Sequence, residues 1–488
     1  MNILIISSEA VPYIKTGGLG DVAGTLAIKL SDRGHSVRLV LPLFRDIDKK
    51  RYNLKIILPS LDVTMGDVVM KCRVWESIHS ECLQVYFIEY NEYFDRSPIY
   101  DDGKHEYRDN GARFAFFSKA ALELSLYLKF KPHIAHCNDW QTALVGYYLK
   151  AWRWPKNFFK NTATVLSIHN MGYQGETELS LSKFIGLSWM QVREEEFESM
   201  GGLNFLKGGI YYADHITTVS PTYANEIVSE PGAGGLSTFL VRRKGDITGI
   251  LNGIDTLEWN PESDSLLPAN YSLTNLKGKA KCKSELQKRF FLHLDPEVPI
   301  FGLVGRLAYQ KGLDLLKECL HEVLSWDLQM IILGSGDSKL SDFFGDLPKW
   351  YPGKVGAYIG FRSELAHMIE AGSDFFIMPS RYEPCGLNQM YSMRYGTVPI
   401  VRTTGGLTDT VEKFDPINQS GTGFSFNDPT PLALKNTIGW ALSTWYNDKK
   451  GYDMLQKNGM KIDFSWEPAV KDYEKVYLKA KNRRKEWL

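Results

Sequence analysis

Two positively charged residues follow an apolar, strand-like run in the second half of the chain. The run IFGLV leads into the loop GRLAYQKGLD, which carries Arg306 and Lys311 ahead of a helical stretch that begins near Gly312. Cations beside the free amides of a helix N-terminus bind phosphate groups and stabilise a diphosphate as it leaves. The loop therefore predicts a diphosphate site, with a solvent-exposed basic turn as the alternative.

A carboxylate stands in the loop after another strand-like run, DFFIMPS. In SRYEPCGLNQ, Glu383 can accept hydrogen bonds from vicinal sugar hydroxyls, while the amides of Cys385, Gly386 and Leu387 can face a phosphate or the sugar. A nucleophilic role for Cys385 is disfavoured, because no pattern of partner His and Asn residues accompanies it. Packing or contact with a substrate is the expected role of this cysteine.

Two further loops of the first half carry titratable groups after strand-like runs. HCNDW contains Asp139, and SIHNMGYQG contains His169 and Asn170. Asp139 and His169 are interpreted either as a base and its partner or as residues that cap the backbone, and the sequence leaves both open. A glycine loop, TTGGLTDT at 403–410, lets backbone approach a ligand closely through Gly406.

The stretch KTGGLGDV, residues 15–22, looks like a phosphate loop but matches neither familiar type. A P-loop has its lysine and hydroxyl after the glycines, whereas Lys15 and Thr16 precede them. The GxGxxA dinucleotide pattern should follow its strand at once and have an acid at the end of the next strand, and the run SVRLVLP ends without one. A nicotinamide-dependent dehydrogenase is therefore disfavoured.

Apolar runs alternate with helical stretches along the chain, which predicts an α/β protein with parallel sheets wound on both faces. The strand-like runs of the first half are NILIIS, SVRLVLP, LQVYFIEY, HIAHCND, TATVLSIHN and HITTVS. The pattern restarts with IFGLVGR, QMIILGSG, GAYIGF, DFFIMPS and TVPIVRT. Two doubly wound domains joined near residues 245–260 follow, with ligands expected beyond the carboxyl ends of the strands.

Composition limits the class of protein. A chain of 488 residues exceeds one usual hydrophobic core. Lys plus Arg equals Asp plus Glu at 57 each, which argues against nucleic acid as a partner. No run approaches the ~20 apolar residues of a membrane span. The six cysteines show no CxxC pair, and Met1 leads straight into a strand, so we expect a cytoplasmic protein without a signal peptide or membrane contact.

The motifs together resemble those of one family. KTGGLGDV, HCNDW, SIHNMGYQG, TVSPTYANEI, LNGID, GRLAYQKGLD, SRYEPCGLNQ and TTGGLTDT occur in the order found in bacterial glycogen synthases and plant starch synthases, over nearly the whole chain. The resemblance implies a GT-B fold of two Rossmann-like domains facing a deep cleft. It implies an acceptor-side domain at 1–248, a donor-binding domain at 249–462, and a C-terminal helix at 463–488 that packs back on the first domain.

The resemblance also implies an activity. Such an enzyme transfers α-glucose from ADP-glucose to the nonreducing end of an α-1,4-glucan such as glycogen, with retention of configuration and without a metal or other cofactor. Paired carboxylates of the kind used by retaining glycosidases are not evident. We therefore expect front-face displacement, in which the leaving diphosphate helps to deprotonate the acceptor hydroxyl.

Site roles are carried over by motif. Arg306 and Lys311 would neutralise the diphosphate, Glu383 would hold glucosyl hydroxyls, His169 would lie near the reacting carbon, and Asp139 on the acceptor side. Lys15 would reach the donor across the closed cleft. The other implied substrate-binding residues are Gly17, Gly18, Asp21, Asn170, Asn252, Phe361, Cys385, Gly386, Leu387, Tyr391, Gly406, Leu407 and Thr408.

Two positions depart from what related enzymes carry. Phe361 stands where the family often has a tyrosine that stacks on adenine, so stacking is kept and the hydroxyl lost. Tyr391 stands where many retaining GT-B enzymes have a glutamate that holds the ribose. The alternatives to ADP-glucose transfer are UDP-glucose as donor and a non-catalytic glucan-binding protein on the same scaffold. Intact Lys15, Arg306, Lys311 and Glu383 argue against the latter.

Overall fold

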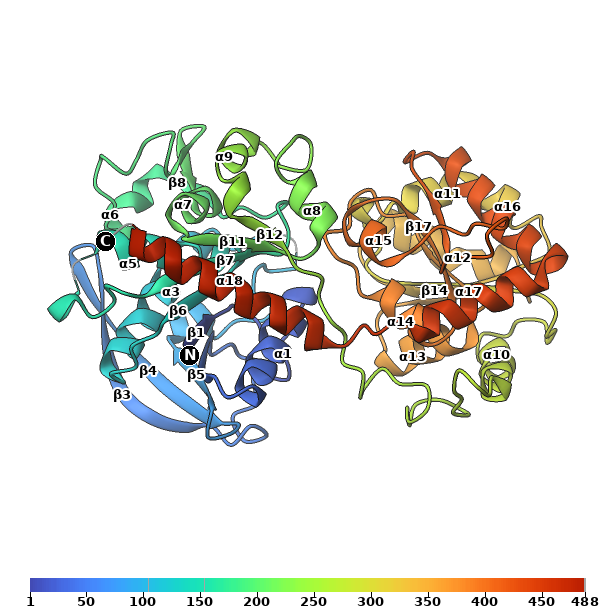
Figure 1. Ribbon diagram of the computed structural model, residues 1–488, viewed down its shortest axis with the longest axis horizontal. Coiled ribbons are helices and arrows are strands. Elements are labelled where there is room, and N and C mark those ends of the chain that lie inside the picture. The colour runs from blue at the N-terminus through green and yellow to red at the C-terminus, as the bar shows by residue number, and fades with distance from the viewer. Residues whose placement is uncertain (104, 153, 487–488) are drawn as a thin grey trace. The chain divides into compact units, whose positions relative to one another are not determined.

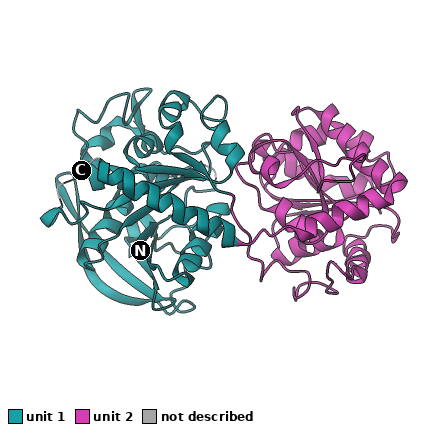
Figure 2. Ribbon diagram, in the orientation of Figure 1, with its two compact units in different colours: residues 1–250, 466–488 teal, residues 251–465 magenta. Residues whose placement is uncertain are grey.

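The chain forms two compact units. The computed structural model describes residues 1–103, 105–152 and 154–486 (Figure 1). Unit 1 comprises residues 1–250 and 466–488, and unit 2 comprises residues 251–465 (Figure 2). The sequence-based boundaries, 248 and 462, lie within a few residues of the two points where the chain passes between the units.

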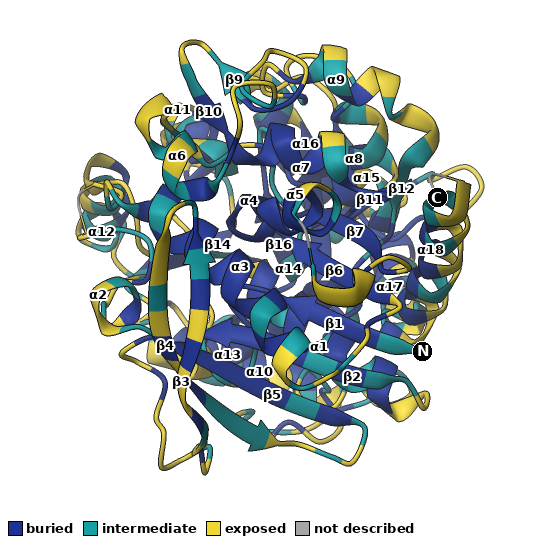
Figure 3. Cartoon of the chain, turned by 90° about the vertical axis from the view of Figure 1, so that its left-hand side faces the viewer, coloured by how far each residue is buried: buried dark blue, intermediate teal, exposed yellow. Residues whose placement is uncertain are grey.

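Unit 1 is built on a nine-stranded sheet with the order β12-β11-β7-β6-β1-β2-β5-β4-β3. Its parallel strands are β1 Asn2–Ile6, β2 Ser36–Pro42, β5 Leu83–Glu89, β6 Ile134–Asn138, β7 Ala163–Ile168, β11 His215–Thr218 and β12 Ile247–Gly249. Every residue of β6 and β7 is buried, as in a parallel strand covered on both faces (Figure 3). The strands predicted in the first half are confirmed.

One edge of this sheet differs from the predicted parallel arrangement. Strands β3 Lys55–Met65 and β4 Val68–Ile78 form an antiparallel hairpin, and β4 also pairs antiparallel with β5. Pro59 lies in β3 within the second of two shifts of register, the one between Leu58 and Leu61. A proline is tolerated there because β3 is the edge strand and its outer side has no ladder partner in the sheet.

Helices cover the sheet of unit 1, and a small second sheet lies beside it. The helices are α1 Gly18–Asp32, α2 Asn91–Phe94, α3 Asn110–Tyr127, α4 Asp139–Thr142, α5 Leu144–Ala151, α6 Ser182–Ile185, α7 Phe205–Tyr212, α8 Pro221–Glu226, α9 Ser237–Arg242 and α18 Trp466–Glu486. The small sheet has the order β8-β10-β9, with β8 Glu176–Glu178, β9 Glu198–Ser199 and β10 Gly202–Asn204.

The C-terminal helix α18 belongs to unit 1, where it packs on α1 and on strands β6, β7 and β11. A row of buried side chains, joined by hydrogen bonds, fixes α18 on the sheet. Tyr477 Oη lies 2.8 Å from His136 Nδ1, whose Nε2 lies 2.6 Å from Ser167 Oγ, and that oxygen lies 2.5 Å from Thr217 Oγ1. Because these residues come from β6, β7 and β11, one polar row ties the helix to three neighbouring strands.

Unit 2 has a six-stranded sheet in which every neighbouring pair is parallel, with the order β15-β14-β13-β16-β17-β18. Its strands are β13 Ile300–Val304, β14 Gln329–Gly334, β15 Val355–Ile359, β16 Phe375–Met378, β17 Val398–Arg402 and β18 Phe424–Phe426. Its helices are α10 Lys277–Arg289, α11 Leu313–Val323, α12 Ser338–Trp350, α13 Ser363–Gly372, α14 Asn388–Arg394, α15 Gly405–Thr410, α16 Pro431–Asn447 and α17 Lys449–Lys461.

The central strand β16 shows how its apolar run fills two cores. Phe375 and Ile377 belong to one buried cluster, and Phe376 and Met378 belong to another. Successive side chains of a strand point to opposite faces, so a continuous apolar run supplies both layers of helices. The strands predicted in the second half are confirmed, and β18 is added to them.

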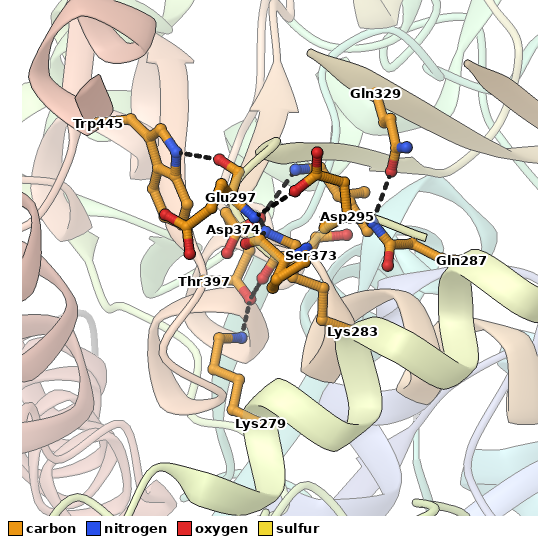
Figure 4. Close-up of polar contacts among 12 residues, drawn as sticks. Lys279, Lys283, Gln287, Asp295, Glu297, Gln329, Ser373, Asp374, Thr397 and Trp445 are labelled. Atoms are coloured by element: carbon orange, nitrogen blue, oxygen red, sulfur yellow. Dashed lines mark hydrogen bonds and ion pairs between the residues drawn. The ribbon is translucent and has the colours of Figure 1, made fainter. Parts of the chain in front are cut away.

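Buried lysines attach α10 to the sheet of unit 2 (Figure 4). Lys283 Nζ lies 2.9 Å from Asp374 Oδ2, and the same oxygen accepts the Ile300 N–H at 2.8 Å. Lys279 Nζ donates to Ala371 O at 2.9 Å and to Thr397 Oγ1 at 2.8 Å. Ile300 begins β13, so this network lies at the amino end of the strand, opposite the end where a ligand is expected.

Candidate active site

Lys311 and Glu383, predicted from two separate loops, meet in unit 2. Lys311 Nζ lies 2.6 Å from Glu383 Oε2, and Ser380 Oγ donates to the same oxygen at 2.9 Å. Glu383 is only 5% exposed. A carboxylate in such surroundings is stable as an ion only when a cation and a hydroxyl bind it, and both are present here. The two predicted residues therefore form one charged site.

A glycine brings the two loops together. Gly312 has φ of 65°, and a Cβ at this position would lie 2.0 Å from the carbonyl oxygen of Pro379. Arg381 N also donates to Gln310 O at 2.8 Å, so the loop after β13 runs against the loop after β16. Helix α11 begins at Leu313, directly after the glycine, as predicted. Any other residue at 312 would force the loops, and with them the Lys311–Glu383 pair, apart.

Arg306 lies two residues beyond the end of β13 and is exposed. Among the residues that the structure describes, none accepts a hydrogen bond or forms an ion pair with its guanidinium. An exposed guanidinium can bind a phosphate through two parallel hydrogen bonds. Arg306 thus offers donor capacity that its own protein surroundings do not use.

Three successive amides follow Glu383. The backbone N–H groups of Cys385, Gly386 and Leu387 donate to no acceptor within the described ranges. Burial raises the pKa of the Cys385 thiol to about 12, so this cysteine is not a nucleophile at neutral pH. Asn252 lies against the same thiol, and its Oδ1 is buried without a hydrogen-bond partner in the described part of the chain. The loop therefore keeps donors and an acceptor unused.

In the glycine loop at 403–410, backbone amides that were expected to bind the donor are already hydrogen-bonded within the protein. The amides of Gly406, Leu407 and Thr408 donate to Glu383 O at 3.1 Å, Thr404 O at 3.1 Å and Thr404 O at 3.4 Å. Leu407 is also fully buried. These amides stabilise the turn into α15 and are not left over for a ligand. The loop instead packs its backbone against the Glu383 loop and supports it.

Phe361 and Tyr391, the two aromatic residues at positions that depart from related enzymes, lie in different surroundings. Phe361 follows β15 and is 72% exposed, which leaves its ring open to stack on a base. Tyr391 is 9% exposed, and its ring stacks on Trp259 with centroids 3.8 Å apart. Trp259 stacks in turn on His367 at 3.8 Å. The Tyr391 ring is therefore part of a packed aromatic stack, unlike the ring of Phe361.

Asp139 and His169 lie together in unit 1, at the carboxyl ends of β6 and β7. Asp139 Oδ1 accepts the backbone N–H of His169 at 2.6 Å, and His169 Nε2 lies 3.0 Å from Asn138 Oδ1. Of the two interpretations left open by the sequence, capping of the backbone is the one observed. Burial raises the pKa of Asp139 to about 7 and lowers that of His169 to about 4.

The backbone at Asp139 is unusual. Its φ is 54°, the left-handed region that non-glycine residues rarely occupy and that is enriched at functional sites. Asn170 follows His169 and uses its side chain within its own loop, where Oδ1 accepts the Gly172 N–H at 2.9 Å. The unit 1 cluster thus combines a neutral imidazole with a carboxyl group whose pKa lies close to physiological pH.

The KTGGLGDV stretch spans the end of the loop after β1 and the start of α1, which begins at Gly18. Lys15 Nζ is 2.9 Å from Asp21 Oδ1. A Cβ at Gly17 or Gly18 would meet no atom within 4 Å, which leaves the open approach that the family resemblance implied for these two positions. The close packing occurs at Gly24, where a Cβ would lie 2.2 Å from Val11 O. Gly20, the third glycine of the stretch, is packed as well, because a Cβ there would lie 2.6 Å from Lys15 Cβ. Gly20 and Gly24 therefore pack the helix against the loop.

The sequence analysis missed two residues of this region, Glu9 and Tyr100. Glu9 is 3% exposed, and its carboxylate accepts hydrogen bonds from Thr16 and from the hydroxyl of Tyr100. Glu9 does carry a sequence signal, because it is an acid three residues after the apolar strand NILII. Tyr100 carries none, since only the fold brings it next to residue 9.

Within the described ranges, no group of three or more His, Cys, Asp or Glu side chains could hold a metal ion. Over the same residues, no helix is long and apolar enough to cross a membrane.

Comparison with known proteins identifies the family. Residues 2–242 match the starch synthase catalytic domain, and residues 284–461 match the glycosyl transferases group 1 domain. The chain is 43% identical to glycogen synthase 1 of Geobacter metallireducens, over 99% of this chain and 97% of that protein. It is 45% identical to the glycogen synthase of Anaeromyxobacter sp. strain Fw109-5, over 98% and 99%. The chain belongs to the glycogen and starch synthase family.

Solved structures agree with this family. The catalytic domain of starch synthase IV from Arabidopsis thaliana, bound to ADP and acarbose, superposes with a TM-score of 0.90 at 33% identity and 99% coverage of both chains. Sucrose-phosphate synthase from Thermosynechococcus elongatus, at 18% identity and a TM-score of 0.61 over 98% of each chain, shares the fold. The predicted family and GT-B fold are confirmed, and the chain is a glycosyltransferase that transfers glucosyl units in glycogen or starch synthesis.

Proposed function

We propose that this chain transfers the glucosyl unit of ADP-glucose to the nonreducing end of an α-1,4-glucan, with retention of configuration and release of ADP. The observation that carries the proposal is the Lys311–Glu383 pair, 2.6 Å apart, at the carboxyl end of a parallel sheet beside three unused amides. A cation and free amides suit a diphosphate, while a buried carboxylate suits sugar hydroxyls.

On the donor side, Arg306 and Lys311 neutralise the diphosphate as the glucosyl bond breaks. The charge on the leaving oxygen grows in the transition state, so fixed cations and amides stabilise that state more than the bound substrate. The amides of Cys385, Gly386 and Leu387 donate to the phosphate or to the sugar. Asn252, whose Oδ1 is buried and unpartnered in the described chain, accepts from a ligand hydroxyl.

The sugar is oriented by Glu383 and His169. Glu383 accepts hydrogen bonds from vicinal hydroxyls of glucose, and His169 lies near the reacting carbon. In front-face displacement the bond from carbon 1 to the diphosphate breaks, and the bond to the acceptor oxygen forms on the same face. The acceptor proton passes to an oxygen of the leaving diphosphate, so no protein base is needed.

Unit 1 supplies the acceptor side. A glucan is neutral, and the cluster around Asp139 and His169 is uncharged except for the ionised fraction of Asp139, whose pKa is about 7. Lys15, oriented by Asp21 at 2.9 Å, acts on the same donor molecule as Arg306. Gly17 and Gly18 leave room for that approach.

ADP-glucose is favoured as donor over UDP-glucose for two reasons. The starch synthase IV catalytic domain, 33% identical, was solved with ADP. Phe361 presents an exposed ring, and a purine offers a larger face for stacking than a pyrimidine. We assign the reaction to the cytoplasm, since all six cysteines are free.

Incubation with radiolabelled ADP-glucose or UDP-glucose and glycogen, followed by counting of precipitated glucan, tests the proposal. We expect label from ADP-glucose at a rate at least about ten-fold above that from UDP-glucose, a difference of about 1.4 kcal/mol. Faster incorporation from UDP-glucose would overturn the donor assignment. No incorporation from either donor would favour a non-catalytic glucan-binding protein.

A further inference from the structure

A buried carboxylate, that of Glu9, lies in the loop that carries Lys15. Glu9 is 3% exposed and forms no ion pair with any residue that the structure describes. Its Oε1 accepts Thr16 Oγ1 at 2.8 Å and the Tyr100 hydroxyl at 2.6 Å, and its Oε2 accepts the Thr16 backbone N–H. A buried carboxylate bound only by neutral donors is costly, so its persistence indicates a specific use.

Glu9 accepts hydrogen bonds from Thr16, the residue after Lys15, and not from Lys15 itself. The ammonium of Lys15 pairs with Asp21 at 2.9 Å. The backbone N–H and the hydroxyl of Thr16 both donate to this one carboxylate, so the backbone directly after Lys15 is fixed from inside the protein. The amino-terminal part of the loop is fixed as well, because Ser7 Oγ donates to Glu9 O at 2.7 Å and Val11 N donates to Gly20 O at 2.9 Å.

Tyr100 completes the network from a distant part of the chain. Its hydroxyl also lies 2.7 Å from Ser8 Oγ, and its own carbonyl accepts Asn110 Nδ2 at 2.9 Å. Burial raises the pKa of Tyr100 well above its ordinary value, so the hydroxyl keeps its proton and donates to Glu9. The segment before α3 thereby holds the carboxylate in one position.

We propose that Glu9 and Tyr100 are positioning residues, which hold Thr16 and thereby aim Lys15 at the diphosphate of the donor. This inference rests on the proposed role of Lys15. Neither residue needs to touch the substrate. Glu9 acts through the backbone of residue 16, and Tyr100 acts by orienting Glu9.

The geometry predicts which substitutions are tolerated. In Glu9→Gln the amide oxygen can still accept the Thr16 N–H, and the new NH₂ can donate to two hydroxyls, which accept as well as donate. Glu9→Ala removes both acceptor oxygens, and with them all three hydrogen bonds, and leaves the Thr16 N–H without this partner. A residue that acted on the substrate through its negative charge would instead lose as much function in Glu9→Gln as in Glu9→Ala.

The test is a double-mutant cycle measured as kcat and KM for ADP-glucose with glycogen as acceptor. We expect Glu9→Ala to lower kcat/KM by about 10- to 100-fold, the range for loss of a hydrogen bond to a charged group. Glu9→Gln should restore most of that loss. Combined with Lys15→Ala, Glu9→Ala should cost less than about three-fold more, because the two act as one unit.

If Glu9→Ala folds poorly, Tyr100→Phe tests the same hydrogen-bond network with a smaller change. It should lower kcat/KM by about three- to ten-fold, and this loss should again vanish in the Lys15→Ala background. Asp214→Asn is the matched control, since Asp214 is also a fully buried carboxylate of unit 1, bonded to Thr164 and Lys150. Its effect on kcat/KM should be below about two-fold and independent of Lys15.

Two results would overturn the inference: equal losses in Glu9→Gln and Glu9→Ala, or full additivity of Glu9→Ala with Lys15→Ala. A Lys15→Ala variant with native kcat/KM would instead refute the proposed role of Lys15. The two failures are therefore distinguishable.

Discussion

Unit 1 and unit 2 both carry polar loops at the carboxyl ends of parallel strands, yet the titratable groups buried near those ends differ between the two units. Unit 2 buries charges in pairs, as in Lys311–Glu383 at 2.6 Å and, at the opposite end of its sheet, Lys283–Asp374 at 2.9 Å (Figure 4). In unit 1, burial holds His136 and His169 neutral by lowering their pKa to about 3 and about 4.

The difference matches what each unit is proposed to bind. A diphosphate carries charge that must be compensated, and an ion pair whose cation can turn to a ligand supplies that compensation. A glucan is neutral, so fixed charges facing it would only add a desolvation cost. The comparison makes predictions on stability and on catalysis, and each can be tested on one unit with the other as reference.

Acid should unfold unit 1 before unit 2. His136, His169 and His215 have their pKa lowered by burial to about 3, 4 and 4, so the folded state stays unprotonated while the unfolded state binds protons below about 6.5. Stability is therefore lost as pH falls from about 6.5 to about 4. Asp139, with its raised pKa, offsets part of this loss, and the net loss is of the order of several kcal/mol.

In unit 2 the shifted groups act differently over that range. Lys279 has its pKa lowered to about 8, so its destabilising effect is complete before pH reaches 6.5, and Glu370 has its pKa raised by burial, so it favours the folded state as pH falls. Hydrogen exchange after incubation at each pH, with one common labelling pulse, checks the order. His79→Gln, at an exposed histidine, is the control. Earlier exchange in unit 2 would contradict the prediction.

Lys311→Ala should lower turnover far more than it weakens glucan binding. Removal of one preorganised donor to a leaving group typically costs about 10²- to 10³-fold, and the variant also leaves Glu383 buried without its cation. We expect kcat/KM for ADP-glucose to fall by this factor, with binding of glycogen in a cosedimentation assay unchanged. The control is Lys317→Ala in α11, whose ammonium lies 4.8 Å from the Phe343 ring. Equal losses in both variants would refute the assignment.

Phe361→Ala should raise KM for ADP-glucose by about five- to thirty-fold, because base–aromatic stacking is worth about 1–2 kcal/mol. Phe361→Tyr should stay within about three-fold of the native chain, since the ring and its stacking are kept. The affinity for glycogen should not change in either variant, because the residue lies in unit 2. Weakened glycogen binding in Phe361→Ala would mean that this ring serves the acceptor.

Tyr477→Phe is expected to have the smallest effect. It removes the hydroxyl that lies 2.8 Å from His136 Nδ1 and so leaves a buried nitrogen without its partner. Such a loss costs about 1–3 kcal/mol. Thermal unfolding should show a lower Tm for Tyr477→Phe and no change for Lys475→Ala, whose pair with Asp472 is exposed on the same helix. An unchanged Tm in Tyr477→Phe would show that the polar row does not hold α18.

Local patterns predicted most of the fold because buried parallel strands leave a strong signal. The apolar run of β16 fills two cores at once, and its length and the flanking Gly372 and Pro379 are read directly from the sequence. The hairpin of β3 and β4 gave no such signal. Its strands alternate buried and exposed residues, and Pro59 and the shifted register interrupt the pattern.

The residues of the candidate site also differ in how well the sequence predicted them. Lys311 and Glu383 were predicted because each follows a strand, and strands of a parallel sheet end at one edge. The amides of Gly406 and Leu407 were assigned to a ligand, but they close the turn on Glu383 O and Thr404 O. Whether an amide is free depends on which carbonyl lies opposite, and residue types do not reveal this.

The sequence by itself determined the family, the alternation of strands and helices, and the loops that carry charge, because these depend on residue types at short spacings. Only the tertiary structure decided which groups meet. It placed Tyr100 against Glu9 across 91 residues. It also turned the carboxylate of Asp139 to the backbone of His169 and not to its ring. Those outcomes are set by packing between distant segments, where a few tenths of an ångström decide whether a hydrogen bond forms.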